Sequence, residues 1–375
     1  MKIAINLLPY SSYQGIEVFA ENLMRALARN FPAVKFILIV HQNSPAFTHF
    51  SAPNVQREII HACSTGKIML ALVQQTALRR VLRRTQPDVL LSFSPSFPLW
   101  YGRNIVVIHD CAYDRFNEAA YIFSRLYFKL MFIAAKYFAR RILTVSAFSQ
   151  KELEQLYGIS AERIRVISEG VPAMAAAFNQ RITETLQRFG ISMPYFLYIG
   201  NMRPRKNVVG MVDAFKLFCT HHPDYQFVLA GKYDTRFIDI KKYIVQQGLH
   251  QTVLPIGFIE GEEKTVLYKN AAALLFVSFY EGFGLPVLEA QALGVPVLTA
   301  NSSSLPEVGG RGALYADPYS VTDIAQKMDQ IVSDESLRER IVHEGFINVQ
   351  KFSWDNAAQQ CMAAIQQAYE NTPNK

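Results

Sequence analysis

The chain has 375 residues, of which 50% are hydrophobic and 18% are charged, and it contains four cysteines. This length favours two domains, each with its own core, and the dispersed cysteines form no CxxC pair, which argues against a zinc site or a disulfide framework. The net charge of +7 is uneven, because residues 1–175 hold 20 Lys and Arg against 11 Asp and Glu, whereas the remainder holds 18 against 20.

The start of the chain, MKIAINLLPY, predicts a short strand and a turn rather than a secretory signal, because it lacks a long apolar region and a small-residue cleavage site. No uncharged apolar run of about 18 residues occurs, since even the most lipophilic stretch, 121–141, carries five Lys and Arg residues. We therefore expect a cytoplasmic protein without a membrane-spanning helix.

Short apolar runs recur through the first half of the chain at the spacing of alternating strands and helices. In chain order, the predicted strands are 2–7, 36–40, 89–93, 104–110 and 141–146, and the clearest helical patterns are 17–29 and 76–84. Alternation of this kind predicts a parallel sheet with crossover helices.

The same alternation then occurs a second time. The predicted strands are 195–200, 226–232, 253–258, 272–278 and 295–300, and helical patterns cover 208–218 and 264–271. The predicted fold class is therefore α/β, with two domains that each contain a doubly wound parallel sheet.

Glycine and proline at positions 170 and 172 interrupt the pattern between the two series. The tail begins with helix-capping residues, Ser353 and Asp355, and continues with good helix formers, so we expect a helix that packs on one or both domains. The predicted division is 1–172 for the N-terminal domain, 173–352 for the C-terminal domain and 353–375 for the C-terminal helix.

The segment 274–300, LLFVSFYEGFGLPVLEAQALGVPVLTA, predicts a strand, a glycine turn and a helix. Gly282 and Gly284 form the turn, Pro286 lies where the first helical residue is expected, and Gly294 ends the helix. Glycines let backbone N–H groups approach an anion, and the helix N-terminus adds the positive end of its dipole. The segment therefore predicts a phosphate-binding loop.

Two carboxylates bracket this loop. Glu281 precedes it and Glu289 lies about one turn into the helix, so the two side chains can reach different ends of one ligand, with Glu289 near ribose hydroxyls. Taken singly, these residues fit a shaped turn with solvated glutamates. Together, EGFGLPVLE resembles the E-x7-E motif of retaining nucleotide-sugar glycosyltransferases of family 4. The fold of that family, called GT-B, implies two Rossmann-like domains that face each other across a cleft.

The resemblance assigns a role to each part of the motif. It implies that Glu281 contacts the donor sugar and that Glu289 holds the ribose. It also implies that the intervening backbone contacts the sugar or the diphosphate, through Gly282, Phe283, Gly284 and Leu285.

The segment 195–215, YFLYIGNMRPRKNVVGMVDAF, is similar to the family's strand, loop and helix at the start of the second domain, with Asn207 as the expected helix cap. Arg205 and Lys206 lie in that loop, where cations can neutralise a diphosphate and stabilise it as a leaving group. The alternative is an exposed basic turn. Many members carry Arg where this chain has Asn201, so Arg203 or Arg205 is left to supply that charge.

In the first domain, the resemblance involves Gly15 and His109. Gly15 precedes a helix whose N-terminus can face a donor diphosphate, although most relatives have two adjacent glycines where this chain has Gln14 and Gly15. His109 ends a predicted strand, as does the family's histidine that faces the donor sugar, and ligands of open α/β sheets bind at such strand ends. The alternative for His109 is a structural histidine held by a local hydrogen bond.

The segment 121–141 interleaves apolar residues at Ile122, Leu126, Leu130, Ile133 and Tyr137 with basic residues. This pattern predicts a core helix with a charged flank. The rival interpretation is a helix that rests on anionic lipid headgroups, supported by the basic run at 78–84 and by the +9 balance of the first half.

The functional hypothesis is transfer of a hexose or deoxyhexose with retention, because the chain resembles bacterial mannosyl- and rhamnosyltransferases of surface-polysaccharide assembly. The resemblance implies a nucleotide diphosphate sugar donor, with a GDP-sugar favoured, and a lipid-linked or oligosaccharide acceptor. The basic balance of residues 1–175 and the segments 78–84 and 121–141 are the reasons to expect a lipid-linked acceptor and a peripheral position at the cytoplasmic face of a membrane. No DxD or HExxH motif is present, so no metal and no cofactor are expected, and nucleic acid is not an expected partner.

Two other classes remain as alternatives. A nicotinamide-dependent oxidoreductase needs GxGxxG after the first strand, which SSYQGIEVFAE lacks. A non-catalytic nucleotide-sugar-binding protein would not need the combination of Glu281, Glu289, Lys206 and His109.

Overall fold

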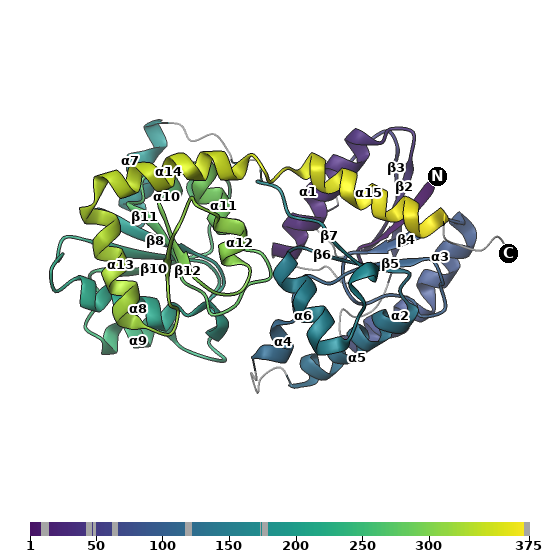
Figure 1. The fold of residues 1–375 in the computed structure, drawn as a ribbon, viewed down its shortest axis with the longest axis horizontal. Helices are drawn as coiled ribbons and strands as arrows, with labels where there is room; N and C mark the ends of the chain where they lie inside the picture. Colours follow the sequence, from purple (N-terminus) through teal and green to yellow (C-terminus); the bar gives the residue numbers. More distant parts are fainter. Residues whose placement is uncertain are drawn as a thin grey trace. The chain divides into compact units, whose positions relative to one another are not determined.

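A computed structural model of the chain describes residues 1–8, 15–42, 47, 50–61, 67–116, 122–172, 174 and 179–370. Predictions that involve Gln14, Cys63, Tyr121 or Ala173 lie outside the described residues. The chain divides into two compact units, which Figure 1 colours along the sequence. Unit 1 comprises Met1–Gly170 and Ser353–Lys375, and unit 2 comprises Val171–Phe352.

Unit 1 contains a parallel sheet with seven strands among the described residues, in the order β3-β2-β1-β4-β5-β6-β7. The strands are β1 (Lys2–Asn6), β2 (Lys35–His41), β3 (Val55–Ile60), β4 (Val89–Ser92), β5 (Asn104–Val107), β6 (Arg141–Thr144) and β7 (Ile164–Val166). Its inner strands are almost continuously buried, as expected when helices cover both faces of a parallel sheet.

The helices of unit 1 before β7 connect these strands in the crossover pattern, and the tail helix joins the unit from the end of the chain (Figure 1). They are α1 (Gly15–Asn30), α2 (Lys67–Gln75), α3 (Ala77–Thr85), α4 (Ala112–Arg115), α5 (Ile122–Phe138), α6 (Ala147–Tyr157), η2 (Ala161–Arg163) and α15 (Trp354–Glu370). The predicted cap of the tail helix is confirmed, because the backbone N–H of Asp355 donates to Ser353 Oγ at 3.2 Å. Helix α15 packs on α1 of the same unit.

Unit 2 repeats the arrangement with six parallel strands among the described residues, in the order β10-β9-β8-β11-β12-β13. The strands are β8 (Tyr195–Ile199), β9 (Gln226–Ala230), β10 (Val253–Gly257), β11 (Ala273–Phe276), β12 (Val297–Ala300) and β13 (Leu314–Ala316). The prediction of two Rossmann-like α/β domains is confirmed.

Helices lie on both sides of this second sheet (Figure 1). They are α7 (Asn179–Arg188), η3 (Pro204–Lys206), α8 (Val208–Phe218), α9 (Ile240–Gln246), α10 (Gly261–Lys269), α11 (Leu285–Ala292), α12 (Leu305–Gly309), α13 (Val321–Ser333) and α14 (Glu335–Val349). The bounds predicted for α8 are those observed. Pro286, predicted as the first residue of its helix, is the second residue of α11.

The strand order of each sheet reverses direction at one place. In unit 1 this switch point lies between β1 and β4, and in unit 2 it lies between β8 and β11. Loops at the carboxyl ends of the two strands beside a switch point leave the sheet in opposite directions, which opens a ligand-binding crevice between them. The loops after β8 and β11 carry the two charged motifs of unit 2.

Helix α5 corrects the sequence prediction of a core helix. Leu126, Leu130, Ile133 and Tyr137, expected in the core, are 57%, 53%, 38% and 69% exposed. The buried face of α5 instead includes Phe132.

Candidate functional site

The loop after β8 is held against the loop after β9 by the backbone. Met202 N donates to the carbonyl of Lys232 at 3.0 Å, and Gly231 lies directly over Gly200. A Cβ at Gly231 would lie 1.7 Å from the Gly200 carbonyl oxygen, so only glycine permits this approach. The basic segment that follows, η3, therefore begins from a fixed position.

Three charged side chains meet where the loops after β8 and β11 come together. Lys206 Nζ lies 2.5 and 2.7 Å from the two carboxylate oxygens of Glu281, and Arg205 donates to Glu281 Oε2 at 3.1 Å. Lys206 is 9% exposed and Glu281 is 5% exposed, so the alternative of an exposed basic turn is wrong. The backbone reinforces the pairing, because Phe279 N donates to the Arg205 carbonyl at 2.9 Å.

The electrostatics of this cluster fix the charge of Glu281. Burial opposes ionisation of the carboxyl, but the nearby charges of Lys206 and Arg205 and the hydrogen bonds outweigh it and lower the pKa of Glu281. Glu281 is therefore an anion at neutral pH. It can accept hydrogen bonds there but cannot act as a general acid.

The glycine turn is shaped by a serine run that follows β12. Glu281 N donates to Ser303 Oγ at 3.1 Å, and Ser304 Oγ donates to the carbonyls of Glu281 and Phe283 at 2.9 and 2.6 Å. Gly284 has φ +123°, and a Cβ there would lie 2.8 Å from a methyl carbon of Leu305. The turn thus requires glycine at its last position, and α11 starts immediately after it.

The second carboxylate of the motif lies in α11. Glu289 is 3% exposed, and each of its oxygens has a partner from α10: Lys264 Nζ at 2.6 Å and Tyr268 Oη at 2.8 Å. Burial and the charge of Glu289 raise the pKa of Tyr268 well above its usual value, so the phenol keeps its proton. Glu289 is therefore held rigidly rather than solvated.

Two residues of the basic loop differ from expectation. Asn207 has φ +55° and its side chain does not cap α8; it donates instead to the carbonyls of Val277 and Pro318 at 3.0 and 2.8 Å. Asn207 thus occupies the predicted N-cap position of α8 without a cap hydrogen bond from its side chain, because the same amide ties the loop after β8 to those after β11 and β13. Arg203 lies 3.9 Å from Asp234 and is not part of the Glu281 cluster.

In unit 1, His109 lies just beyond the end of β5. Its Nε2 is 3.3 Å from the carbonyl of Phe93, and Phe19 of α1 packs edge-on at a centroid distance of 4.9 Å. A carbonyl only accepts, so this contact places the proton on Nε2 and leaves Nδ1 as an acceptor. Burial lowers the pKa of His109 to about 4, against the opposing effects of Asp110 and the Phe93 carbonyl.

Gly15 is the first residue of α1 and is exposed, with open space where a Cβ would be. Gly15 and His109 belong to unit 1, whereas the other predicted site residues belong to unit 2. Within unit 2, the structure brings Arg205, Lys206 and Glu281 together, and Glu289 forms a separate cluster one helix turn beyond the glycine loop.

Comparison with known families agrees with this arrangement. The family described as Glycosyltransferase Family 4 matches residues 13–173, and the family described as Glycosyl transferases group 1 matches residues 186–346. The chain belongs to glycosyltransferase family 4. The resemblance drawn from the Glu281 and Glu289 motif is thereby confirmed.

Individual relatives of this family 4 chain include O-antigen chain mannosyltransferase B of Escherichia coli, which is 36% identical over 234 residues, or 60% of each chain. The serotype-specific mannosyltransferase WbdA of Escherichia coli is 29% identical over 226 residues, which cover 59% of this chain and only 28% of that protein. Among solved structures, Anabaena HepE in complex with UDP and glucose matches with a TM-score of 0.76 and 18% identity, covering 98% of this chain and 100% of HepE.

Several residues that shape the site of this family 4 chain were missed by sequence reasoning. Lys264 and Tyr268 are four residues apart on α10, a spacing that places both on one helix face, but nothing in their own segment indicated Glu289 as the shared partner. Ser303 and Ser304 belong to a serine run after a predicted strand, which could have indicated a loop rich in hydrogen bonds.

Two kinds of feature are absent from the part of the chain that the structure describes. Within it, no group of three or more His, Cys, Asp or Glu residues is arranged to hold a metal ion. Among the same residues, no helix has both the length and the apolar character needed to cross a bilayer.

Proposed function

We propose that this chain transfers a mannose-type hexose from a nucleotide diphosphate, with a GDP-sugar favoured, to a saccharide acceptor during assembly of a bacterial surface polysaccharide. The observation that carries the proposal is the buried cluster of Lys206, Arg205 and Glu281 at the switch point of the unit 2 sheet. Two relatives that are named as mannosyltransferases favour mannose over other hexoses.

The cluster has the charges that such a donor needs. Two cations share one carboxylate, which leaves an excess positive charge, and the glycine turn leads into the positive end of α11. We assign the diphosphate to Lys206, Arg205 and the backbone from Gly282 to Leu285. As the bond to the sugar breaks, negative charge grows on the departing diphosphate, and these groups stabilise it.

The ionised Glu281 suits the donor sugar, because a carboxylate accepts hydrogen bonds from sugar hydroxyls. Glu289 suits the ribose. Each of its oxygens already accepts one hydrogen bond, from Lys264 or Tyr268, but a carboxylate has about four acceptor positions, so two ribose hydroxyls can still bind.

Unit 1 contributes His109 and Gly15 to the proposal. The depressed pKa keeps the imidazole of His109 neutral at neutral pH, so its role is to accept a hydrogen bond from a sugar hydroxyl through Nδ1 rather than to transfer a proton. Gly15 leaves the first turn of α1 open, and a glycine there allows close approach of an anion to the backbone N–H groups.

We further propose that the reaction retains the anomeric configuration. The acceptor hydroxyl attacks the anomeric carbon on the face that the diphosphate leaves, the bond from that carbon to the phosphate oxygen breaks, and the departing phosphate oxygen takes the acceptor proton. This route assigns no covalent role to a side chain. It requires the strong stabilisation of the leaving group that Lys206 and Arg205 supply.

The test is transfer from labelled GDP-mannose and from a panel of other nucleotide sugars to mannose oligosaccharides and to their lipid-linked forms. Proton NMR of the first-formed linkage reports its anomeric configuration. We expect an α-linked product from an α-linked donor, and an inverted anomer would overturn the assignment of mechanism. Binding of the donor without transfer or hydrolysis would instead favour the non-catalytic alternative.

A further inference from the structure

Helix α5 carries an apolar surface that faces away from the core of unit 1. The exposed side chains follow one another at spacings of three and four residues, which places them on one narrow face of a helix. We define the α5 stripe as Phe123, Leu126, Leu130, Ile133 and Tyr137, which are 86%, 57%, 53%, 38% and 69% exposed.

The exposure of the stripe does not come from a loosely attached helix. On the inner face, Phe132 is buried in the unit 1 core and packs against Tyr157 at a centroid distance of 5.2 Å. At the helix end, the Arg163 guanidinium donates to the carbonyls of Lys136 and Ala139. The helix is therefore fixed in place while its outer face stays apolar and open to solvent.

The charges beside the stripe have one sign. Helix α5 contains Arg125, Lys129 and Lys136 and no acidic residue. Helix periodicity places all three on the same flank of the stripe, and Lys129 is exposed. An apolar face bordered by basic side chains is the pattern of a helix that lies in the interface of an anionic membrane.

A second basic surface is connected to α5 through the loop after β4. Tyr127 of α5 donates to Ser96 Oγ at 3.0 Å, and four residues further on, Trp100 lies under the guanidinium of Arg79 from α3, 5.2 Å from the ring centroid. Leu99 and Trp100 are each 36% exposed. This loop therefore adds apolar and aromatic surface between α5 and α3.

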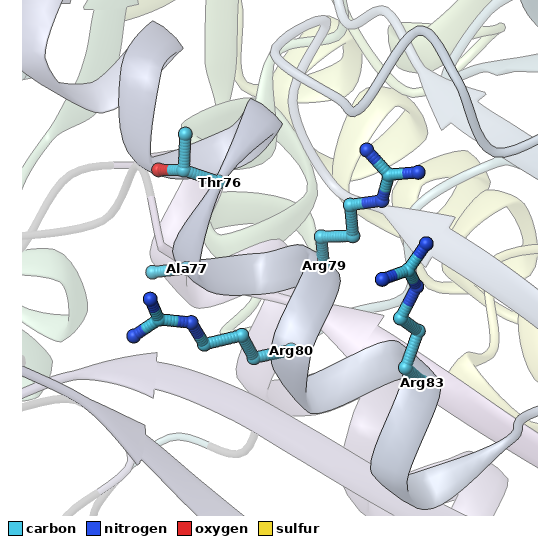
Figure 2. Close-up of a pocket in the computed structure, with 5 residues that line it drawn as sticks. All are labelled: Thr76, Ala77, Arg79, Arg80 and Arg83. Atoms are coloured by element: carbon cyan, nitrogen blue, oxygen red, sulfur yellow. The ribbon is translucent and has the colours of Figure 1, made fainter.

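Helix α3 is basic along its exposed side. Figure 2 shows Arg79 and Arg83 extending to one side of α3, with Arg80 on the other. Together with Thr76 and Ala77, they line an open hollow of about 320 Å³. These three arginines form no ion pair with any described residue, whereas the neighbouring Arg84 pairs with Glu58. Three exposed guanidinium groups are thus available for anionic headgroups.

We propose that the α5 stripe, together with the basic residues of α5 and the three arginines of α3, is a docking surface for an anionic phospholipid bilayer. In this arrangement the stripe inserts to the depth of the acyl-chain boundary, and the arginines contact lipid phosphates. A second copy of the chain is disfavoured as the occupant, because two such helices would bring basic flanks of the same sign together. The proposal stands independently of the donor sugar and of catalysis.

The test is co-sedimentation of the full chain with vesicles of phosphatidylcholine alone or mixed with phosphatidylglycerol, at low and high salt, without nucleotide sugar. We expect binding to the anionic vesicles that high salt weakens. Glycerol phosphate and inorganic phosphate serve as soluble competitors: weak competition supports bilayer docking, and complete displacement by either would overturn it in favour of a simple phosphate site.

Two variants separate the apolar and the charged contributions. Because each Arg near an anionic surface contributes roughly a factor of five in affinity, Arg80→Gln with Arg83→Gln should weaken binding about 25-fold. Leu126→Ser with Leu130→Ser should weaken it at least about tenfold, because two exposed leucines no longer enter the interface. Matched controls on unit 2, Arg311→Gln with Lys269→Gln and Leu217→Ser with Val245→Ser, should bind as the parent does.

Each variant is first checked for parental thermal unfolding. Absence of binding to anionic vesicles at low salt would overturn the proposal, as would equal losses in the unit 2 controls. Sedimentation velocity tests whether a second copy of the chain covers the stripe instead. A concentration-dependent dimer that is lost in the variant Leu126→Ser with Leu130→Ser, together with no binding to vesicles, would assign the stripe to a second copy.

Discussion

Glu281→Gln removes the carboxylate that pairs with both Lys206 and Arg205 while keeping nearly the same shape. Lys206 Nζ now lies 2.5 and 2.7 Å from the two carboxylate oxygens of Glu281. In the variant it would face an uncharged amide instead, with the cation of Arg205 close by. Removing one partner of a buried ion pair costs about 3–5 kcal/mol, because it leaves an uncompensated buried charge. We expect Glu281→Gln to destabilise unit 2 by about 3 kcal/mol at neutral pH.

A double-mutant cycle identifies the cause of that loss. Lys206→Met alone leaves Glu281 paired with Arg205, but in the Glu281→Gln background it removes one of two repelling cations and should restore stability. We therefore expect a coupling free energy of about 2–3 kcal/mol between the two sites. Urea unfolding followed by circular dichroism measures it, and Glu339→Gln on the exposed side of α14 should stay within about 0.5 kcal/mol of the parent.

The difference in unfolding free energy between the parent and Glu281→Gln should change with pH in one direction. The pKa of Glu281 is lower in the folded state than its usual value, so its contribution to stability is complete above about 4.5 and is lost as the pH falls through the folded pKa. The difference between the parent and Glu281→Gln should be constant around neutrality and shrink in acid. Equal stability of the two at neutral pH, or no coupling to Lys206, would refute the buried ion-pair cluster.

Three further predictions concern single residues. Glu289→Ala should weaken binding of the free nucleotide diphosphate by about 1.5–3 kcal/mol in calorimetry, and unchanged affinity would remove Glu289 from the ribose site. The pKa of His109 falls to about 4 on folding, so protonation favours the unfolded state. The stability of the parent relative to His109→Gln should therefore fall as the pH drops from about 6.5 to about 4. A pH-independent difference in stability would contradict this. Gly284→Ala should cost about 1–3 kcal/mol because of the φ of +123° and the contact with Leu305, whereas Gly102→Ala, in open space, should unfold at the parental temperature.

The sequence predicted the repeated α/β architecture because the inner strands of both sheets are buried on both faces and therefore appear as continuous apolar runs. It missed β3, β7 and β13. Strand β3, VQREII, pairs only with β2 at the sheet edge and exposes its polar residues, so it lacks an apolar run. Strands β7 and β13 have three residues each, too few for a periodic pattern.

The candidate site was predictable where its residues are close in sequence and not where they are brought together by the fold. Glu281, Gly284 and Glu289 lie within one strand, turn and helix, so their spacing alone indicated a ligand loop. The contact of Lys206 with Glu281 spans 75 residues and depends on the adjacency of β8 and β11, which no local pattern contains. For that reason Lys206 could be assigned to an exposed turn although it is almost fully buried.

Helix α5 shows a different limit of pattern reading. Its sequence, IFSRLYFKLMFIAAKYF, is apolar on two faces, and periodicity alone does not say which of them meets the core. In the structure, the face that contains Phe132 packs into the core, whereas Leu126 and Leu130 on the other face are more than half exposed. A helix needs only one apolar face to pack on a domain, so the second face calls for a second apolar medium. The basic residues beside that face, rather than its hydrophobicity, are what select an anionic lipid surface over a second protein.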